Sequence, residues 1–160
     1  MTDIKIRSFK PGDRDWVVDA HQAYYATAHG FDSTFGVLVG EILDNFLAAH
    51  DPYMEAGWIA TQGERRLGCI FCVRIDADVA KLRLFFLSDS ARGKGLGKEL
   101  LGRCMGFAKA RGYQEMRLWT HEEHRAAGAL YAKAGWTLCS AESVVSFGVP
   151  LVEQHWRVWL

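Results

Sequence analysis

The residues best suited to chemistry form one glycine-rich stretch, Arg92-Gly93-Lys94-Gly95-Leu96-Gly97-Lys98. It follows an apolar run at 82–87 and opens a segment, 96–111, whose apolar residues recur at helical spacing. The first N–H groups of a helix lack intrahelical partners and carry partial positive charge. Glycines let the backbone approach an anion closely, and Lys94 and Lys98 add charge. The stretch therefore predicts a phosphate or pyrophosphate site at the start of a helix.

Two widespread phosphate motifs do not fit these letters. A Walker A loop would need Gly at position 92 and Ser or Thr at 99, where the chain has Arg92 and Glu99. The dinucleotide fingerprint would need a third Gly at 98 or 100, where the chain has Lys98 and Leu100. The pattern that fits is Arg-x-x-Gly-x-Gly, beginning at Arg92. Taken alone, this hexad is equally compatible with an ordinary turn that carries solvated lysines.

The elements that would position this loop follow from hydrophobic periodicity and from turn residues. We expect strands at 4–9, 57–61, 67–75, 79–87, 115–120, 136–138, 144–147 and 155–160. We expect helices at 16–29, 96–111 and 122–134, and a further helix that includes residues 37–47. Gly30, Gly112 and Gly135 are expected at helix ends. The order β-α-α-β-β-β-α-β-α-β-β predicts an α/β fold with a mixed central sheet flanked by helices.

A second motif, Leu130-Tyr131-Ala132-Lys133-Ala134-Gly135-Trp136, closes the last expected helix. Together with Arg-x-x-Gly-x-Gly and the element order, it resembles the GCN5-related N-acetyltransferases, the GNAT family. The resemblance covers nearly the whole chain, so we expect a single domain over 1–160. The segments 80–84 and 146–156 are similar to the subgroup often fused to MarR-type regulators, and the chain has no room for such a regulator.

The resemblance implies acetyl-CoA as cosubstrate and assigns residues to it. The loop from Arg92 to Lys98 would hold the pyrophosphate. The pantetheine arm would lie between the strands at 79–87 and 115–120, with Phe85, Phe86 and Leu87 offering backbone groups. His124 stands where many members have an Asn that contacts the arm. No residue is expected to bind a metal ion.

Tyr131 aligns with the tyrosine that can protonate the departing thiolate as a general acid. The alternative for this residue is half-buried packing with a solvated hydroxyl. His121 is the candidate general base, with a water relayed to bulk solvent as the other option. Both residues are therefore hypotheses about catalysis that geometry has to test.

The acceptor would be contacted by aromatic residues of the first two helices and their loop, namely Tyr24, Tyr25, His29, Phe31 and Phe35. Such a group can also be ordinary core. Arg83 is a charge within a central strand, where it is costly unless paired. It would bind an acceptor carboxylate or pair with Glu41 or Asp44, and we slightly favour the structural pairing.

Composition excludes several classes. Lys plus Arg and Asp plus Glu both number 19, so no basic excess favours nucleic acid. No apolar run approaches a membrane span, and the N-terminus lacks a signal-peptide core. The four cysteines lie in apolar segments, which favours a cytoplasmic protein. In Cys69-Ile-Phe-Cys72 the two thiols would face opposite sides of a strand, so joint metal ligation is not expected.

The function hypothesis is transfer of an acetyl group from acetyl-CoA to a primary amine of a small molecule, by direct attack in a ternary complex. Two alternatives remain open, a protein N-terminal or lysine acetyltransferase and a non-catalytic acyl-CoA sensor. A homodimer is compatible with Trp156 and Trp159 near the C-terminus, which would join a subunit interface or cover the sheet.

Overall fold

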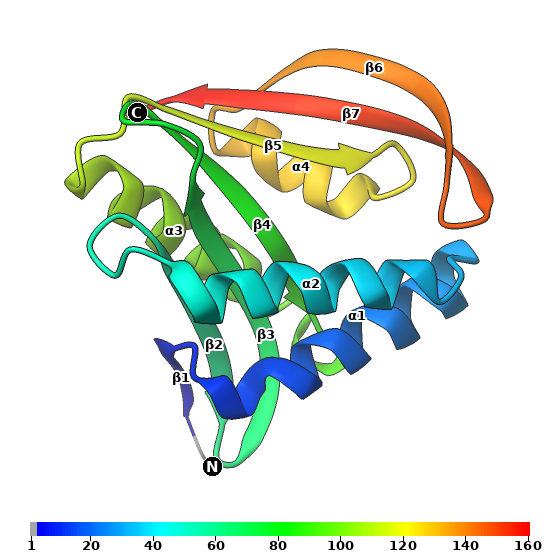
Figure 1. Ribbon diagram of the computed structural model, residues 1–160, viewed down its shortest axis with the longest axis horizontal. Helices are drawn as coiled ribbons and strands as arrows, with labels where there is room; N and C mark the ends of the chain where they lie inside the picture. The colour runs from blue at the N-terminus through cyan, green and yellow to red at the C-terminus, as the bar shows by residue number, and fades with distance from the viewer. Residues whose placement is uncertain (1–2) are drawn as a thin grey trace. The chain divides into compact units, whose positions relative to one another are not determined.

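The computed structural model describes residues 3–160 and confirms the α/β class (Figure 1). The strands are β1 (Ile4–Ser8), β2 (Ala56–Gln62), β3 (Arg65–Arg74), β4 (Val79–Leu87), β5 (Glu115–His121), β6 (Thr137–Ser146) and β7 (Val149–Trp159). The helices are α1 (Arg14–His29), α2 (Thr34–Ala49), α3 (Leu96–Ala110) and α4 (Arg125–Lys133), with short 3₁₀ turns η1 (Pro11–Asp13) and η2 (Asp89–Ala91).

The chain divides into two compact units. The first contains residues up to 11, residues 50–116 and Leu160, and the second contains residues 12–49 and 117–159. In the strand order of the sheet, β1-β2-β3-β4 belong to the first unit and β5-β7-β6 to the second. The expectation of one domain over 1–160 stays a prediction.

The first unit is an antiparallel meander of β1 to β4, with α3 packed on it. Its core contains fully buried Ile59, Phe71 and Leu100, one from each of β2, β3 and α3. Trp58 and Phe107 meet edge to face across the β2–α3 contact, with ring centroids 5.4 Å apart. This packing holds α3, and therefore its N-terminal loop, against the sheet.

Strand β4 carries a bulge that hydrophobic periodicity did not indicate. Phe86 pairs with Cys69, and Arg83 pairs with Phe71, so two residues of β4 stand opposite one residue of β3. Leu84 adopts a positive φ of 51°, which is uncommon for a residue with a branched side chain. The Cys69 thiol donates to the Leu84 carbonyl at 3.2 Å, which satisfies one backbone group that the bulge displaces.

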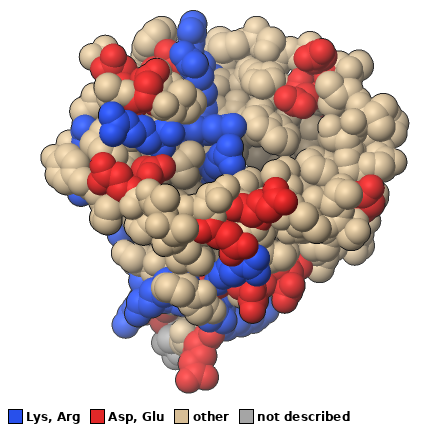
Figure 2. Space-filling view, in the orientation of Figure 1, with Lys and Arg blue, Asp and Glu red and all other residues tan. Residues whose placement is uncertain are grey.

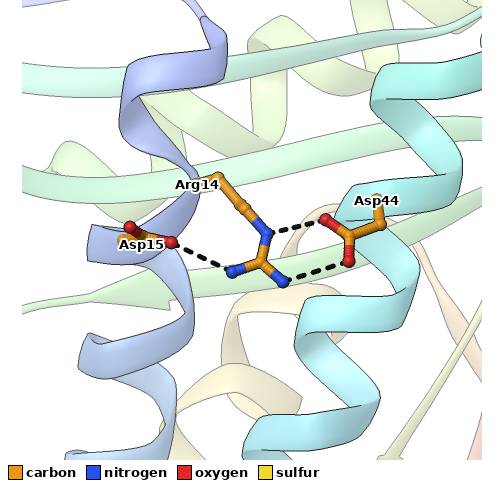
Figure 3. A network of polar contacts seen from close by, with 3 residues as sticks. All are labelled: Arg14, Asp15 and Asp44. Carbon is orange, nitrogen blue, oxygen red and sulfur yellow. Dashed lines mark hydrogen bonds and ion pairs between the residues drawn. The ribbon is translucent and has the colours of Figure 1, made fainter.

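The second unit brings together α1, α2, β5, α4 and the hairpin of β6 and β7. Gly30 ends α1 with φ at 71°, and its N–H donates to the Ala26 carbonyl at 3.1 Å, as the sequence predicted. The guanidinium of Arg14 on α1 donates from Nε and Nη2 to both Asp44 oxygens on α2, at 2.7 and 3.1 Å (Figure 3). A further Arg14 contact, to Asp15, fixes the same guanidinium from its own helix.

The largest departures from the sequence prediction are the start of α4 and the extents of the C-terminal strands. Helix α4 begins at Arg125, three residues after the expected start at 122, because residues 122–124 form a turn in which the His124 N–H donates to the His121 carbonyl at 3.0 Å. The strands expected at 136–138 and 144–147 form one continuous strand, β6, and β7 begins at Val149 instead of at the expected 155. Strands β6 and β7 form one hairpin, whose turn uses positive φ at Phe147 and Gly148.

The charged surface is mixed in sign. On the visible face, Lys and Arg side chains lie beside Asp and Glu side chains, and neither sign covers that face (Figure 2). Within residues 3–160, no helix has both the length and the apolar character that a membrane span needs.

Candidate active site

The glycine-rich stretch of the first unit forms a turn between β4 and α3. Gly93 and Gly95 both have φ at 76°, and Gly95 is the N-cap of α3. A Cβ at either position would meet nothing within 4 Å. The left-handed backbone, and not a shortage of space, is therefore what requires glycine at these two positions.

The turn carries exposed, positively charged side chains. Arg92, Lys94 and Lys98 are exposed, whereas Leu96 and Gly97 are buried. Arg92 lies 3.5 Å from the carboxylate of Asp89 in η2. The first turn of a 15-residue helix thus starts at the loop, and the orphan N–H groups of that turn meet two lysine charges.

Strand β4 supplies Phe85, Phe86 and Leu87 just before the loop. Phe86 is buried at 8% exposure, and the other two are half-buried. The bulge at Leu84 lies next to them and breaks the regular alternation of backbone groups on this strand. The sequence predicted these residues as a strand but gave no signal of the bulge.

Arg83 is half-buried in β4, and burial lowers the pKa of its guanidinium. Its Nε is buried and has no hydrogen-bond partner in the described chain. Asp44, one of the two carboxylates expected to pair with it, has both oxygens bound by Arg14. Of the two carboxylates expected for the structural pairing, Asp44 is therefore already engaged, and the pairing with Glu41 stays a prediction.

Tyr131 lies in the last turn of α4, in the second unit, and is 4% exposed. Its ring packs against Trp136 and Trp156, with centroids 5.7 and 6.0 Å away. The Trp136 N–H donates to the Tyr131 carbonyl at 3.0 Å, which closes the helix end. The spacing of Tyr131 and Trp136 in the motif thus has a packing role.

Aromatic and imidazole side chains of the second unit gather in one group, the ring cluster. Tyr25 lies near its centre, with ring centroids 4.7 Å from Phe35 and 5.3 Å from Phe31. Phe147, from the hairpin turn, packs on Phe31 at 4.8 Å. The cluster consists of Tyr24, Tyr25, His29, Phe31, Phe35, His121, His124 and Phe147.

Three imidazoles of the ring cluster face one another. His29 and His121 meet edge to face at 4.6 Å between centroids, and His124 lies 5.8 Å from His121 and 6.1 Å from His29. Among residues 3–160, no group of three His, Cys, Asp or Glu side chains has an arrangement that would hold a metal ion.

His121, at the end of β5, is 5% exposed. Neither of its ring nitrogens has a hydrogen-bond partner in the part of the chain that the structure describes. Burial, and after it the nearby His29, lower the pKa of His121 to about 4, while Glu123 acts in the opposite direction. His121 is therefore a neutral imidazole with unused hydrogen-bonding capacity at neutral pH.

His124 is the N-cap of α4, and its Nδ1 lies 3.4 Å from the hydroxyl of Tyr25. Tyr25 was expected to contact the acceptor, and His124 the coenzyme. The structure joins these two residues directly. A substitution of one of them will therefore alter the hydrogen bonding of the other.

One buried histidine was missed. His21 on α1 is 2% exposed, and its Nδ1 lies 2.8 Å from the Val17 carbonyl. Burial lowers the pKa of His21 to about 4, although the contact with Val17 opposes this. The available signal was its spacing of four residues from Val17 and Tyr25, which places all three on the buried face of α1.

The structure thus distributes the predicted site residues over two units. Arg83, the residues at 85–87 and the loop at 92–98 belong to the first unit. The second unit brings Tyr24, Tyr25, His29 and Phe31 together with His121 and His124, while Tyr131 packs separately with two tryptophans.

Comparison with known proteins agrees with this architecture. The model of the acetyltransferase (GNAT) family matches residues 14–136. The chain is 24% identical over 144 residues to an uncharacterized N-acetyltransferase of Methanocaldococcus jannaschii, covering 82% of this chain and 61% of that protein.

Solved structures show the same fold. Spermidine N-acetyltransferase from Vibrio cholerae, in complex with CoA and spermine, is similar with a TM-score of 0.74 and 16% identity, over 98% of this chain and 95% of that one. A Salmonella typhimurium protein solved with its cofactor acetyl-CoA has a TM-score of 0.73 and 16% identity, over 98% and 94% of the two chains.

The family match spans well over half of the chain, so the protein belongs to the acetyltransferase (GNAT) family. The resemblance inferred from the glycine loop and the Tyr131 motif is confirmed at this level. The chain spans 61% of the length of the Methanocaldococcus jannaschii protein. It spans 25% of the length of a mycothiol acetyltransferase of Beutenbergia cavernae, to which it is 29% identical over 75 residues, or 47% of this chain.

Proposed function

We propose that this protein transfers an acetyl group from acetyl-CoA to the primary amine of a small molecule. The observation that carries the proposal is the left-handed pair Gly93 and Gly95 at the start of α3. This turn leaves backbone N–H groups and two lysines available to a pyrophosphate, and a GNAT relative of the same fold is solved with acetyl-CoA. Arg92 to Lys98 would hold the phosphates, with 85–87 along the arm.

The reaction proceeds by direct attack in a ternary complex. The amine nitrogen forms a bond to the thioester carbonyl carbon, and the carbon–sulfur bond breaks. The nitrogen loses one proton and the departing thiolate gains one, so the products are an N-substituted acetamide and free coenzyme A. The chain has to place the two reactants, accept the first proton and supply the second.

Tyr131 supplies the proton to the thiolate in this proposal. Its burial among Trp136 and Trp156 supports a fixed hydroxyl, because a ring packed on two sides cannot swing into solvent. The proton of the amine leaves through a water to bulk solvent or through His121, whose pKa of about 4 makes its ring a weak base. The three buried and reduced thiols, Cys69, Cys72 and Cys104, support a cytoplasmic location.

A small molecule is the favoured acceptor. The aromatic and imidazole residues assigned to the acceptor from the sequence belong to the ring cluster, whose centre at Tyr25 and Phe31 is buried, and this suits a compact body better than an extended peptide. The Vibrio cholerae relative is solved with spermine, a small amine, and this agrees in kind with the proposal.

The test is thermal stability with and without acetyl-CoA, repeated with Gly95→Trp. A ligand that binds only the folded state adds about 2.7 kcal/mol at a hundredfold excess over its dissociation constant. We expect a rise in Tm of several degrees in the native chain and none in Gly95→Trp. Gly102→Ala, an exposed position inside α3, is the matched control and should keep the shift. No shift in the native chain would contradict the proposal.

A further inference from the structure

We propose that the acceptor is a monoamine with an apolar or aromatic body, whose nitrogen is bound by His121 inside the ring cluster. This inference rests on the proposed function and specifies its substrate class. It excludes polyamines and other acceptors whose second cationic group would enter the ring cluster.

The first argument is the state of His121. Nearly all buried polar side-chain atoms in proteins have a hydrogen-bond partner, and a buried donor left without one destabilises the folded chain. His121 is 5% exposed, and both of its nitrogens lack partners within residues 3–160. A ligand with a polar atom at this position would remove that cost. An amine fits, because its N–H can donate to the lone pair of a neutral imidazole.

The second argument is what surrounds this imidazole. The rings in contact with His121 are those of Tyr25, His29, Phe31 and His124, at centroid distances from 4.6 to 6.2 Å. Such surroundings accept an apolar or aromatic body through area burial and ring packing. No carboxylate belongs to this group of contacts.

Nearby carboxylates are committed elsewhere or exposed. Asp32, next to Phe31, accepts from the N–H of Thr34 at 3.0 Å and from its hydroxyl, which caps α2. Glu122 and Glu123 follow β5 and are exposed to solvent. A second ammonium group would therefore enter the ring cluster without a buried counter-charge, and burying an unpaired charge is strongly unfavourable.

In this proposal a ligand reaches His121 from the surface side of the ring cluster. His29, Phe35, His124 and Phe147 are half-buried, so the ring cluster reaches the surface. His29 stands edge-on to His121, and a rotation of its side chain would uncover the His121 ring. Rotamer changes of this size are common when ligands bind.

The decisive experiment compares two acceptors of equal length, hexylamine and 1,6-diaminohexane, with 2-phenylethylamine as the aromatic member. Release of free coenzyme A is followed with a thiol reagent. We expect kcat/KM for both monoamines to exceed that for the diamine by about tenfold or more, which corresponds to about 1.4 kcal/mol. An equal or higher value for the diamine, or turnover of spermidine alone, would overturn the inference.

Substitutions of His121 test whether monoamine turnover depends on its ring nitrogens. His121→Phe keeps the ring packing and removes both nitrogens, so monoamine kcat/KM should fall by about tenfold or more while the acetyl-CoA melting shift is kept. His121→Asn, which keeps a polar group, should retain more activity than His121→Phe. His155→Gln, at an exposed histidine of β7, is the matched control and should keep native turnover. Native turnover in His121→Phe would overturn the assignment.

A binding readout separates this inference from the proposed function. In the ¹⁵N–¹H spectrum of the imidazoles, the His121 signals should move when 2-phenylethylamine is titrated into the chain, with or without acetyl-CoA. Movement of these signals with no coenzyme binding would support the acceptor site and contradict the transferase. Coenzyme binding with unmoved His121 signals would keep the transferase and overturn the acceptor site.

Discussion

The hydroxyl of Tyr25 lies 3.4 Å from Nδ1 of His124, and this contact joins the C-terminal half of α1 to the N-cap of α4. When the hydroxyl donates to Nδ1, the ring proton is placed on Nε2, and the outer nitrogen of His124 becomes a donor. Tyr25 thereby determines that His124 presents an N–H donor to a ligand. In GNAT members with Asn at this position, the side-chain amide would present an N–H donor without a neighbouring hydroxyl.

We therefore predict that Tyr25→Phe changes the function more than the stability. The contact is long and part-buried, so its loss should lower the free energy of unfolding by at most about 1 kcal/mol. The KM for acetyl-CoA should rise several-fold, because the His124 ring loses its preferred tautomer. Urea unfolding and steady-state kinetics measure the two effects. Tyr53→Phe, at an exposed tyrosine, serves as the control, and an unchanged KM in Tyr25→Phe would refute the positioning role.

Replacing Gly95 by Ala should destabilise the chain although nothing crowds the position. An L-residue with left-handed φ costs about 1–2 kcal/mol, and Gly95 has φ at 76°. The Tm should fall and acetyl-CoA should bind more weakly, because the loop would leave its anion-binding geometry. Gly102 lies within the same helix, and Gly102→Ala should raise the free energy of unfolding by at most about 1 kcal/mol, because Ala has the higher helix propensity. Calorimetric unfolding of both variants tests whether Gly95→Ala lowers the Tm and Gly102→Ala raises it.

For Tyr131→Phe we expect a loss in kcat of about 10²–10⁴-fold, the usual range for a general acid, with acetyl-CoA affinity unchanged. The packing on Trp136 and Trp156 is kept, so the fold should persist. The matched control is Tyr113→Phe, whose hydroxyl donates to the Met54 carbonyl at 2.8 Å in the first unit. That control should lose about 1 kcal/mol of stability and keep its kcat. A kcat within threefold of native in Tyr131→Phe would argue that its hydroxyl is only structural.

Stability should fall in acid partly because of His21. Its pKa is about 4 in the folded chain, against an ordinary value of 6.5. Above pH 6.5 the ring is neutral in both states. Below that value only the unfolded chain takes up the proton, so the free energy of unfolding decreases until the folded pKa is reached.

At pH 5 this contribution amounts to about 2 kcal/mol. His21→Phe should therefore flatten the decline between pH 7 and pH 5 by that amount. Urea unfolding at several pH values measures the slope. An unchanged slope in the variant would show that His21 is not the group responsible.

Periodicity and end signals were sufficient for most of the fold. The helix ended by Gly30, the loop at Gly95 and the strand at 79–87 all lie where local rules place them. The bulge at Leu84 could not be predicted, because an apolar run reads as continuous strand whether or not one of its residues turns to positive φ. The long hairpin of β6 and β7 was underestimated, since most of β6 is exposed and lacks an alternating apolar face.

The candidate site was predicted as residues but not as an arrangement. Motif spacing identified Gly95 and Tyr131, and aromatic density identified Tyr25 and Phe31. The meeting of His29 with His121 depends on tertiary packing between the end of α1 and the end of β5. No local pattern carries that information, and neither does any pattern show that the nitrogens of His121 stay unbonded.

The hairpin turn has a consequence for how the chain folds. The Phe147 carbonyl accepts from the Asp32 N–H at 2.9 Å, so the ring cluster is closed by two segments far apart along the chain. Closing such a long loop carries a large entropic cost before any contact compensates for it, and contacts of this kind slow folding. During synthesis, residues 31–35 emerge long before the hairpin. The acceptor site would therefore be completed late, after the helices that carry most of its rings have already formed.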